Sequence, residues 1–183
     1  MSVRRYQLIR SGRKTVALQI KDGALLVRAP MNMRKEQIDQ FVSAQEAWIS
    51  KHLQKAAAMP RQAPLGQQEL QELARRAQEE IPRRVAYYAP IVGVNYGRIT
   101  IRAQRTRWGS CSGSGNLSFN CLLMLTPPEV LDSVVVHELC HRKQMNHSAA
   151  FYKEVLRVYP AYHQCNGWLK EHGSALMKRV VKK

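Results

Sequence analysis

The segment His137-Glu138-Leu139-Cys140-His141 decides how this sequence is interpreted. On a helix, residues four apart lie one turn apart on the same face, so the imidazoles of His137 and His141 can reach one metal ion. Zinc is the usual occupant of such a site. Glu138 is offset from His137 by about 100° around the helix, so its carboxylate can hold a metal-bound water and take its proton. This H-E-x-x-H motif predicts a zinc site with Glu138 as the catalytic base.

A third ligand is expected at His147. A catalytic zinc site needs a third protein ligand and an open position for water. His147 follows His137 by ten residues, which is the histidine spacing of the longer H-E-x-x-H-x-x-G-x-x-H pattern. Gln144 stands where that pattern has glycine, so the chain must turn differently, and Asn146 is the candidate because it tolerates a left-handed backbone. The predicted metal ligands are therefore His137, His141 and His147. The alternative is that these histidines are ordinary core or surface residues.

The hydropathy pattern predicts an α+β fold. Strands are expected within residues 4–29, with a hairpin turn at Asp22-Gly23, and over residues 98–104 and 117–123, which we expect to form a hairpin with a long connection. Helices are expected over residues 34–58, over residues 67–88 with a kink or break at Pro82, and from a Thr126 cap to about Met145. Ser148 is expected to cap another helix to about Val158, and a last helix should precede the basic C-terminus.

Segments on both sides of the motif resemble the YgjP-like metal-dependent hydrolase family. They are Arg107-Trp108-Gly109-Ser110-Cys111-Ser112, Gly115-Asn116-Leu117-Ser118-Phe119-Asn120, and the region from Pro128 to Phe151. That family is of zincin type and is related to the SprT-like and WLM-type proteases. The resemblance implies a zincin-like α+β fold in which a small β-sheet accompanies a metal-bearing active-site helix and flanking helices. It also implies zinc on the residues that match His137, His141 and His147, with Glu138 as the catalytic carboxylate. Cys121, Leu122 and Tyr152 depart from the family pattern, which bears on the substrate and not on the metal ligands.

Two prolines and a glycine in residues 60–66 predict a linker or hinge. The hinge separates an N-terminal β-hairpin region and helix, residues 1–59, from a zincin-like metallohydrolase core, residues 67–176. A basic tail, residues 177–183, follows the core. We expect these parts to pack as one compact unit.

The charge balance is strongly basic: 29 Lys and Arg against 13 Asp and Glu give a formal net charge of +16. Such a charge favours a polyanionic partner, namely nucleic acid or nucleotide phosphates, although a charged surface that only keeps the protein soluble gives the same composition. No apolar run is long enough for a membrane span, and the basic N-terminus lacks the apolar region of a secretory signal. We therefore expect a cytoplasmic protein with no membrane partner and with its four cysteines reduced.

Two hydrolytic reactions fit the predicted site. In a metallopeptidase, which we expect, the activated water attacks an amide carbonyl, and the basic surface would suit a DNA-associated protease. In a nucleotide pyrophosphohydrolase, the alternative, Arg102, Arg105 or Arg107 clamps the phosphates of a nucleoside triphosphate. Arginines that converge on the metal would favour phosphates, whereas an unpaired strand edge beside it would favour peptides. The strand around residues 116–125 is either that edge or an internal strand paired on both sides, and the sequence does not choose between the two. A binding module with a structural zinc is a third class, but such a site has no need of Glu138.

Overall fold

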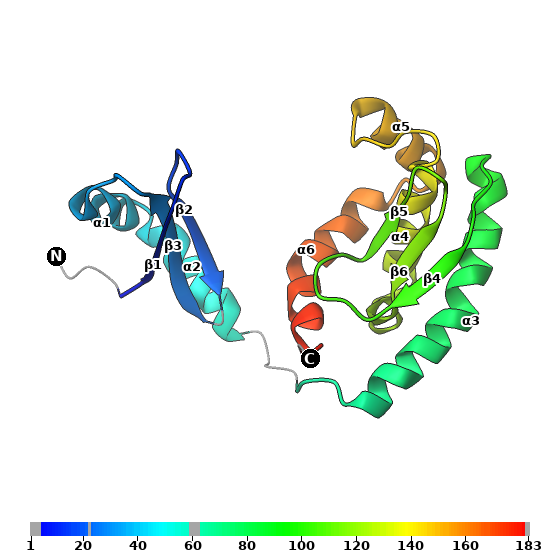
Figure 1. Ribbon diagram of the computed structural model, residues 1–183, viewed down its shortest axis with the longest axis horizontal. Helices are drawn as coiled ribbons and strands as arrows, with labels where there is room; N and C mark the ends of the chain where they lie inside the picture. Colours follow the sequence, from blue (N-terminus) through cyan, green and yellow to red (C-terminus); the bar gives the residue numbers. More distant parts are fainter. Residues whose placement is uncertain (1–4, 22, 59–62, 182–183) are drawn as a thin grey trace. The chain divides into compact units, whose positions relative to one another are not determined.

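The computed structural model describes residues 5–21, 23–58 and 63–181, which form a mixed α+β structure (Figure 1). The chain divides into two compact units, Met1–Arg61 and Gln62–Lys183, which are described separately below. The α+β class is thereby confirmed. The predicted hinge at residues 60–66 includes residues 60–62, which lie outside the described residues, as do residues 182–183 of the predicted tail. The predicted domain limits and the expected packing into one unit stay predictions.

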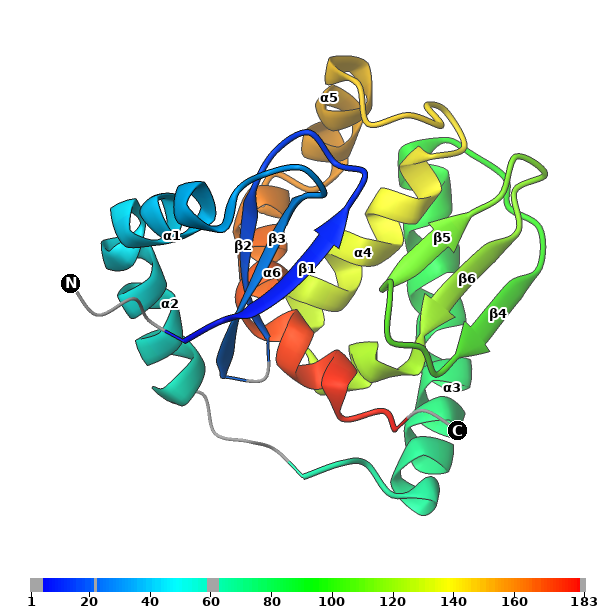
Figure 2. The same ribbon diagram turned by 60° about the vertical axis from the view of Figure 1, so that its left-hand side comes forward.

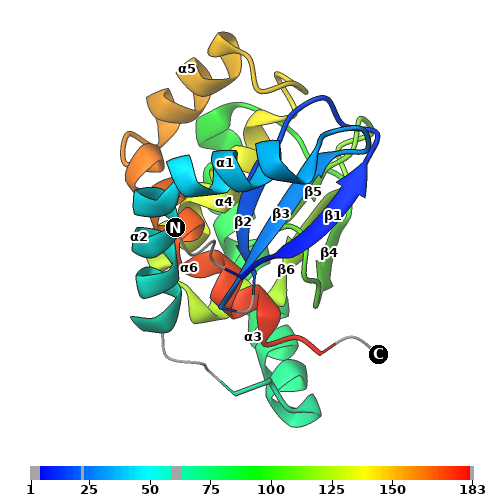
Figure 3. The ribbon, with the colours of Figure 1, turned by 90° about the vertical axis from the view of Figure 1, so that its left-hand side faces the viewer.

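The N-terminal unit is a three-stranded sheet with two helices, α1 and α2, on one side (Figure 3). Its strand order is β1-β3-β2, where β3 pairs in parallel with β1 and antiparallel with β2. Strands β2 and β3 form a hairpin where the Asp22-Gly23 turn was predicted. Asp22 lies outside the described residues, and Gly23 adopts a φ of 80° that favours glycine. The elements are β1 (Gln7–Ser11), β2 (Ala17–Lys21), β3 (Ala24–Pro30), α1 (Lys35–Ala44) and α2 (Glu46–Ala58). The single helix expected over residues 34–58 is thus divided at Gln45, whose ψ of 17° is not helical.

The C-terminal unit contains a second three-stranded sheet, of order β4-β6-β5, and the central helix α4 (Figure 2). Its elements are α3 (Gln67–Val92), β4 (Ile99–Arg102), β5 (Gly109–Cys111), β6 (Leu117–Asn120), the 3-10 turn η1 (Cys121–Leu125), α4 (Pro128–Cys140), α5 (Ala149–Val158) and α6 (Tyr162–Lys178). Helix α4 is buried on nearly every side, and Val135, Val136 and Leu139 are fully covered. A helix that is apolar all round occupies the centre of a core. The histidine pair therefore sits at the end of a buried helix, with His137 in its last turn and His141 as its C-cap.

Three expectations about this unit are corrected. Strands β4 and β6 pair in parallel and do not form a hairpin, because the short strand β5 inserts between them in the chain and forms the hairpin with β6 instead. The second predicted strand stops at Asn120, whose side chain accepts a hydrogen bond from the Leu122 amide and starts the 3-10 turn. Helix α3 runs through Pro82 without interruption, since Ile81 and Val85 on either side are anchored in the core.

The ends of α4 also differ from the prediction. Pro127, not Thr126, is the N-cap residue, and the Thr126 hydroxyl donates to the Leu123 carbonyl at 2.8 Å. The helix ends at Cys140, with His141 as its C-cap, and does not continue to Met145. The predicted helix after Ser148 is confirmed, because the Ser148 hydroxyl accepts from the Phe151 amide. None of the described helices combines the length and apolar character needed to cross a bilayer.

Candidate metal centre

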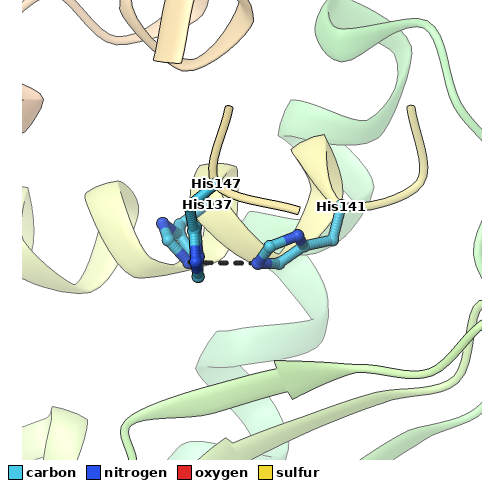
Figure 4. A group of neighbouring side chains, drawn as sticks. All are labelled: His137, His141 and His147. Carbon is cyan, nitrogen blue, oxygen red and sulfur yellow. Dashed lines mark hydrogen bonds between the residues drawn. The ribbon is translucent and has the colours of Figure 1, made fainter. Parts of the chain in front are cut away.

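The three sequence-predicted histidines converge on one point (Figure 4). The Nε2 atom of His137 lies 3.2 Å from Nε2 of His141 and 3.1 Å from Nε2 of His147. His137 belongs to the last turn of α4, His141 is its C-cap, and His147 comes from the loop before α5. Within the part of the chain that the structure describes, no other group of three His, Cys, Asp or Glu side chains offers ligand atoms so close together.

A tight turn after α4 carries the chain back to place His147. The amides of Lys143 and Gln144 both donate to the Cys140 carbonyl at 3.0 Å. The Gln144 carbonyl in turn lies 3.0 Å from Nδ1 of His141. The chain therefore reverses over residues 141–144, before the turn that we predicted at Asn146. The buried ring of Phe151 then packs against His141, with the ring centroids 4.6 Å apart, and supports the cluster from the side of α5.

The donor set fits a divalent cation. Because a backbone carbonyl can only accept, Nδ1 of His141 carries the hydrogen, which leaves an unprotonated Nε2 facing His137. Burial and the two neighbouring histidines lower the pKa of His137 to about 3, and burial also lowers the pKa of His141. Both rings are therefore neutral at neutral pH, and neutral imidazole is the form that binds metal. Three imidazole nitrogens around one point are a set that zinc accepts.

Tyr162 is a site residue that the sequence analysis missed. Its hydroxyl is hydrogen-bonded to Nδ1 of His137 at 2.9 Å, from the first turn of α6, and its side chain is buried. Such a contact to the second ring nitrogen fixes the orientation and tautomer of a metal-binding histidine. His163, the next residue in the chain, is exposed. Nothing in the sequence separates Tyr162 from His163 as a site residue. Tyr162 reaches His137 because α6 packs against α4.

Replacement of Tyr162 by phenylalanine should weaken zinc binding by roughly 10- to 100-fold, because His137 loses the contact that orients it. The ring itself is retained, so the fold should stay intact. Competition with a chromophoric chelator measures the affinity. Tyr159→Phe is the matched control, since the Tyr159 hydroxyl donates to the Glu129 carbonyl, away from the three histidines. Equal zinc affinities in the two variants would contradict the assigned role.

Glu138 is buried, with 5% of its surface exposed, and lies directly over Gly109 of β5. A Cβ atom at position 109 would come within 2.5 Å of Oε1 and 2.7 Å of Cγ of Glu138. Only glycine leaves room for the carboxylate there. Burial raises the pKa of Glu138 to about 8, while the positive charge of Arg107 opposes the shift. Glu138 and His137 line the same cavity, so the carboxylate faces the space beside the histidine cluster.

Hydrogen bonds from Asn120 hold the loop before β5 in place. This fully buried side chain donates to the carbonyls of Gln104 at 2.7 Å and Arg107 at 3.0 Å. The backbone N–H of Asn120 also donates to the Trp108 carbonyl at 2.9 Å. A buried side-chain amide with several partners holds its loop in one conformation. Asn120 therefore sets the position of Gly109 and, through it, the space available to Glu138.

If Glu138 is the catalytic base that the sequence predicts, Gly109→Ala should slow hydrolysis by about 100-fold while metal content stays unchanged. The added methyl group collides with the Glu138 carboxylate, and displacement of a catalytic group by about 1 Å costs a factor of this size. Steady-state kinetics and elemental analysis measure the two quantities. Gly113→Ala is the control, because a Cβ atom at that position meets nothing within 4 Å. A wild-type rate in Gly109→Ala would show that Glu138 does not need this space.

The three arginines proposed as phosphate clamps are exposed and form no side-chain hydrogen bonds or ion pairs with any other described residue. They are Arg102, Arg105 and Arg107. Of these, Arg107 is close enough for its charge to act on Glu138.

Comparison with known proteins gives one family and two related folds. The family model of the YgjP-like metallopeptidase domain matches residues 14–71 and 64–172. Two crystal structures of metallopeptidase zymogens are similar to the chain. Abylysin of Pyrococcus abyssi is 19% identical, with 50% of this chain and 93% of that chain covered and a TM-score of 0.45. Jannalysin of Methanocaldococcus jannaschii is 24% identical, with 55% and 98% covered and a TM-score of 0.42. No curated protein matches the sequence.

Proposed function

Because this chain belongs to the YgjP-like metallopeptidase family, we propose that it is a zinc-dependent peptidase in which Glu138 activates the attacking water. The family supports a metal-dependent peptidase, and the structure gives the chain an α+β fold. Zinc, its ligands His137, His141 and His147, and the role of Glu138 are the parts that we assign. The observation that carries them is the convergence of three imidazoles beside a buried carboxylate.

The chemistry divides between the metal and Glu138. Zinc held by the three histidines supplies Lewis acidity, which lowers the pKa of water and polarises a carbonyl oxygen. Glu138 accepts the proton of the attacking water on its carboxylate and returns it to the leaving nitrogen. The contact with Tyr162 keeps His137 oriented throughout.

Peptides are favoured over phosphates by the free edge of β5, which lies beside α4 (Figure 2). The Trp108 carbonyl and the Ser112 amide both bond toward β6. Because these directions alternate along an antiparallel strand, the backbone groups of Gly109 and Cys111 point outward. An extended peptide can pair with such an edge. Of the two alternatives left open for residues 116–125, the structure has the internal strand: β6 is central in its sheet and paired on both sides.

A turnover screen joined to metal analysis tests the proposal. The full chain, loaded with zinc, is incubated with an unfolded protein, with and without DNA, and separately with nucleoside triphosphates. We expect peptide cleavage that a chelator stops and zinc restores, with the triphosphates left intact. Release of pyrophosphate without peptide cleavage would instead support the pyrophosphohydrolase, for which the nearby charge of Arg107 is the favourable observation. Stimulation by DNA would support a DNA-associated protease.

A further inference from the structure

A cavity of about 210 Å³ opens beside the reacting groups, between α4, α6 and the start of β5. Glu138 and His137 form one wall, while Trp108, Val134, Tyr162 and Leu169 supply its aromatic and aliphatic surface. Gly109 of the open strand edge also lines it. A peptide paired with that edge therefore passes the cavity, and one of its side chains can enter.

The lining selects against charge. It contains no lysine or arginine, and its ionisable groups are His137, Glu138 and the Tyr162 phenol. An acidic side chain would lie against the Glu138 carboxylate, and the lining offers no lysine or arginine with which it could pair. The Ser133 hydroxyl already donates to the Val130 carbonyl at 2.8 Å. A polar occupant would thus find few partners besides Asn166, so the lining suits an apolar occupant.

The size of the cavity depends on a contact between Trp108 and Gly173 of α6. A Cβ atom at position 173 would lie 3.0 Å from Cζ2 and 3.1 Å from Nε1 of Trp108. Glycine is a poor residue for the middle of a helix, and here its missing side chain lets the indole pack against the α6 backbone. A larger residue at position 173 would push the indole toward the space that it now borders.

We propose that this pocket takes a bulky apolar side chain of the substrate next to the scissile bond, and that the Trp108–Gly173 contact sets how large that side chain can be. The proposal rests on the peptidase function above. Its walls place any occupant against His137 and Glu138, where the bond is cut. The space is sufficient for an aromatic ring, since an apolar cavity of roughly 150 Å³ binds benzene.

Cleavage of a mixed peptide library, with both sides of every cleaved bond identified by mass spectrometry, tests the proposal. We expect Phe, Leu or Met on one side of the cleaved bond, favoured over Gly and Asp by on the order of 10-fold or more. Gly173→Ala should shift this preference toward smaller residues such as Val, and Leu169→Ala should shift it toward Trp. Gly167→Ala, in the same helix with nothing within 4 Å of its Cβ position, should leave the profile unchanged. A profile that neither pocket variant alters would overturn the proposal.

A binding measurement separates this proposal from the peptidase function itself. N-acetylphenylalaninamide is titrated into the wild-type protein while the indole N–H signal of Trp108, assigned with Trp108→Phe, is followed by NMR. N-acetylglycinamide serves as the control ligand. Saturable shifts with the phenylalanine compound alone support the pocket even if no peptide is cleaved. Peptide cleavage without such shifts and without an apolar preference would overturn the pocket while leaving the peptidase in place.

Discussion

Replacement of Glu138 by glutamine should reduce peptide hydrolysis by about 100- to 10,000-fold, the range that a single general base contributes. The amide has the same shape as the carboxylate, so it still fits over Gly109. It cannot accept the proton of the attacking water. The three histidines are untouched, and we therefore expect the metal content to stay at the wild-type value. Single-turnover kinetics on a cleaved peptide and elemental analysis measure the two quantities on the same sample.

Glu129→Gln is the matched control for this variant. Glu129 lies in the first turn of the same helix, is exposed, and is remote in sequence from the histidine pair. Its replacement removes the same charge from α4 and should leave the rate unchanged. Undiminished hydrolysis in Glu138→Gln would refute the role of Glu138 as the base. Loss of metal from that variant would show that Glu138 holds the ion, either directly or through the arrangement of the histidines.

Replacement of His147 by alanine should weaken zinc binding by more than the roughly 100-fold that loss of an outer hydrogen bond can cost, because a ligand itself is removed. Hydrolysis should fall with the zinc occupancy. His147 is exposed and lies in a loop outside α4, so the buried helix should keep its packing. Elemental analysis after gel filtration against a competing chelator measures retained zinc, and circular dichroism checks the fold.

His172→Ala is the control for the loss of a histidine. The His172 ring packs on Trp168 of α6 at a centroid distance of 4.6 Å and is not one of the three converging histidines. We expect this variant to retain zinc at the wild-type level. If His147→Ala also retained full zinc, His147 would be removed from the ligand set, and the site would need a third ligand from elsewhere.

Local patterns in the sequence predicted much of the site. The spacing of His137 and His141 follows directly from the helical repeat, and the position of His147 follows from a turn and the Ser148 cap. The structure brings the ligand atoms of all three side chains close together. The Asp22-Gly23 hairpin was predicted for the same reason, since a two-residue turn depends on its own residues. Such features depend on residues only a few positions apart in the chain, so the sequence spacing is enough to predict them.

Contacts between distant segments had to come from the tertiary structure. The parallel pairing of β4 with β6, and the edge position of β5, depend on strand register that no local pattern encodes. Tyr162 approaches His137 only because α6 packs on α4, and Gly109 is required only because Glu138 lies over it. Thus the sequence by itself determined which residues could form the metal centre. The packing of elements far apart in the chain decided what orients the centre, what room its carboxylate has, and which open strand edge lies beside it.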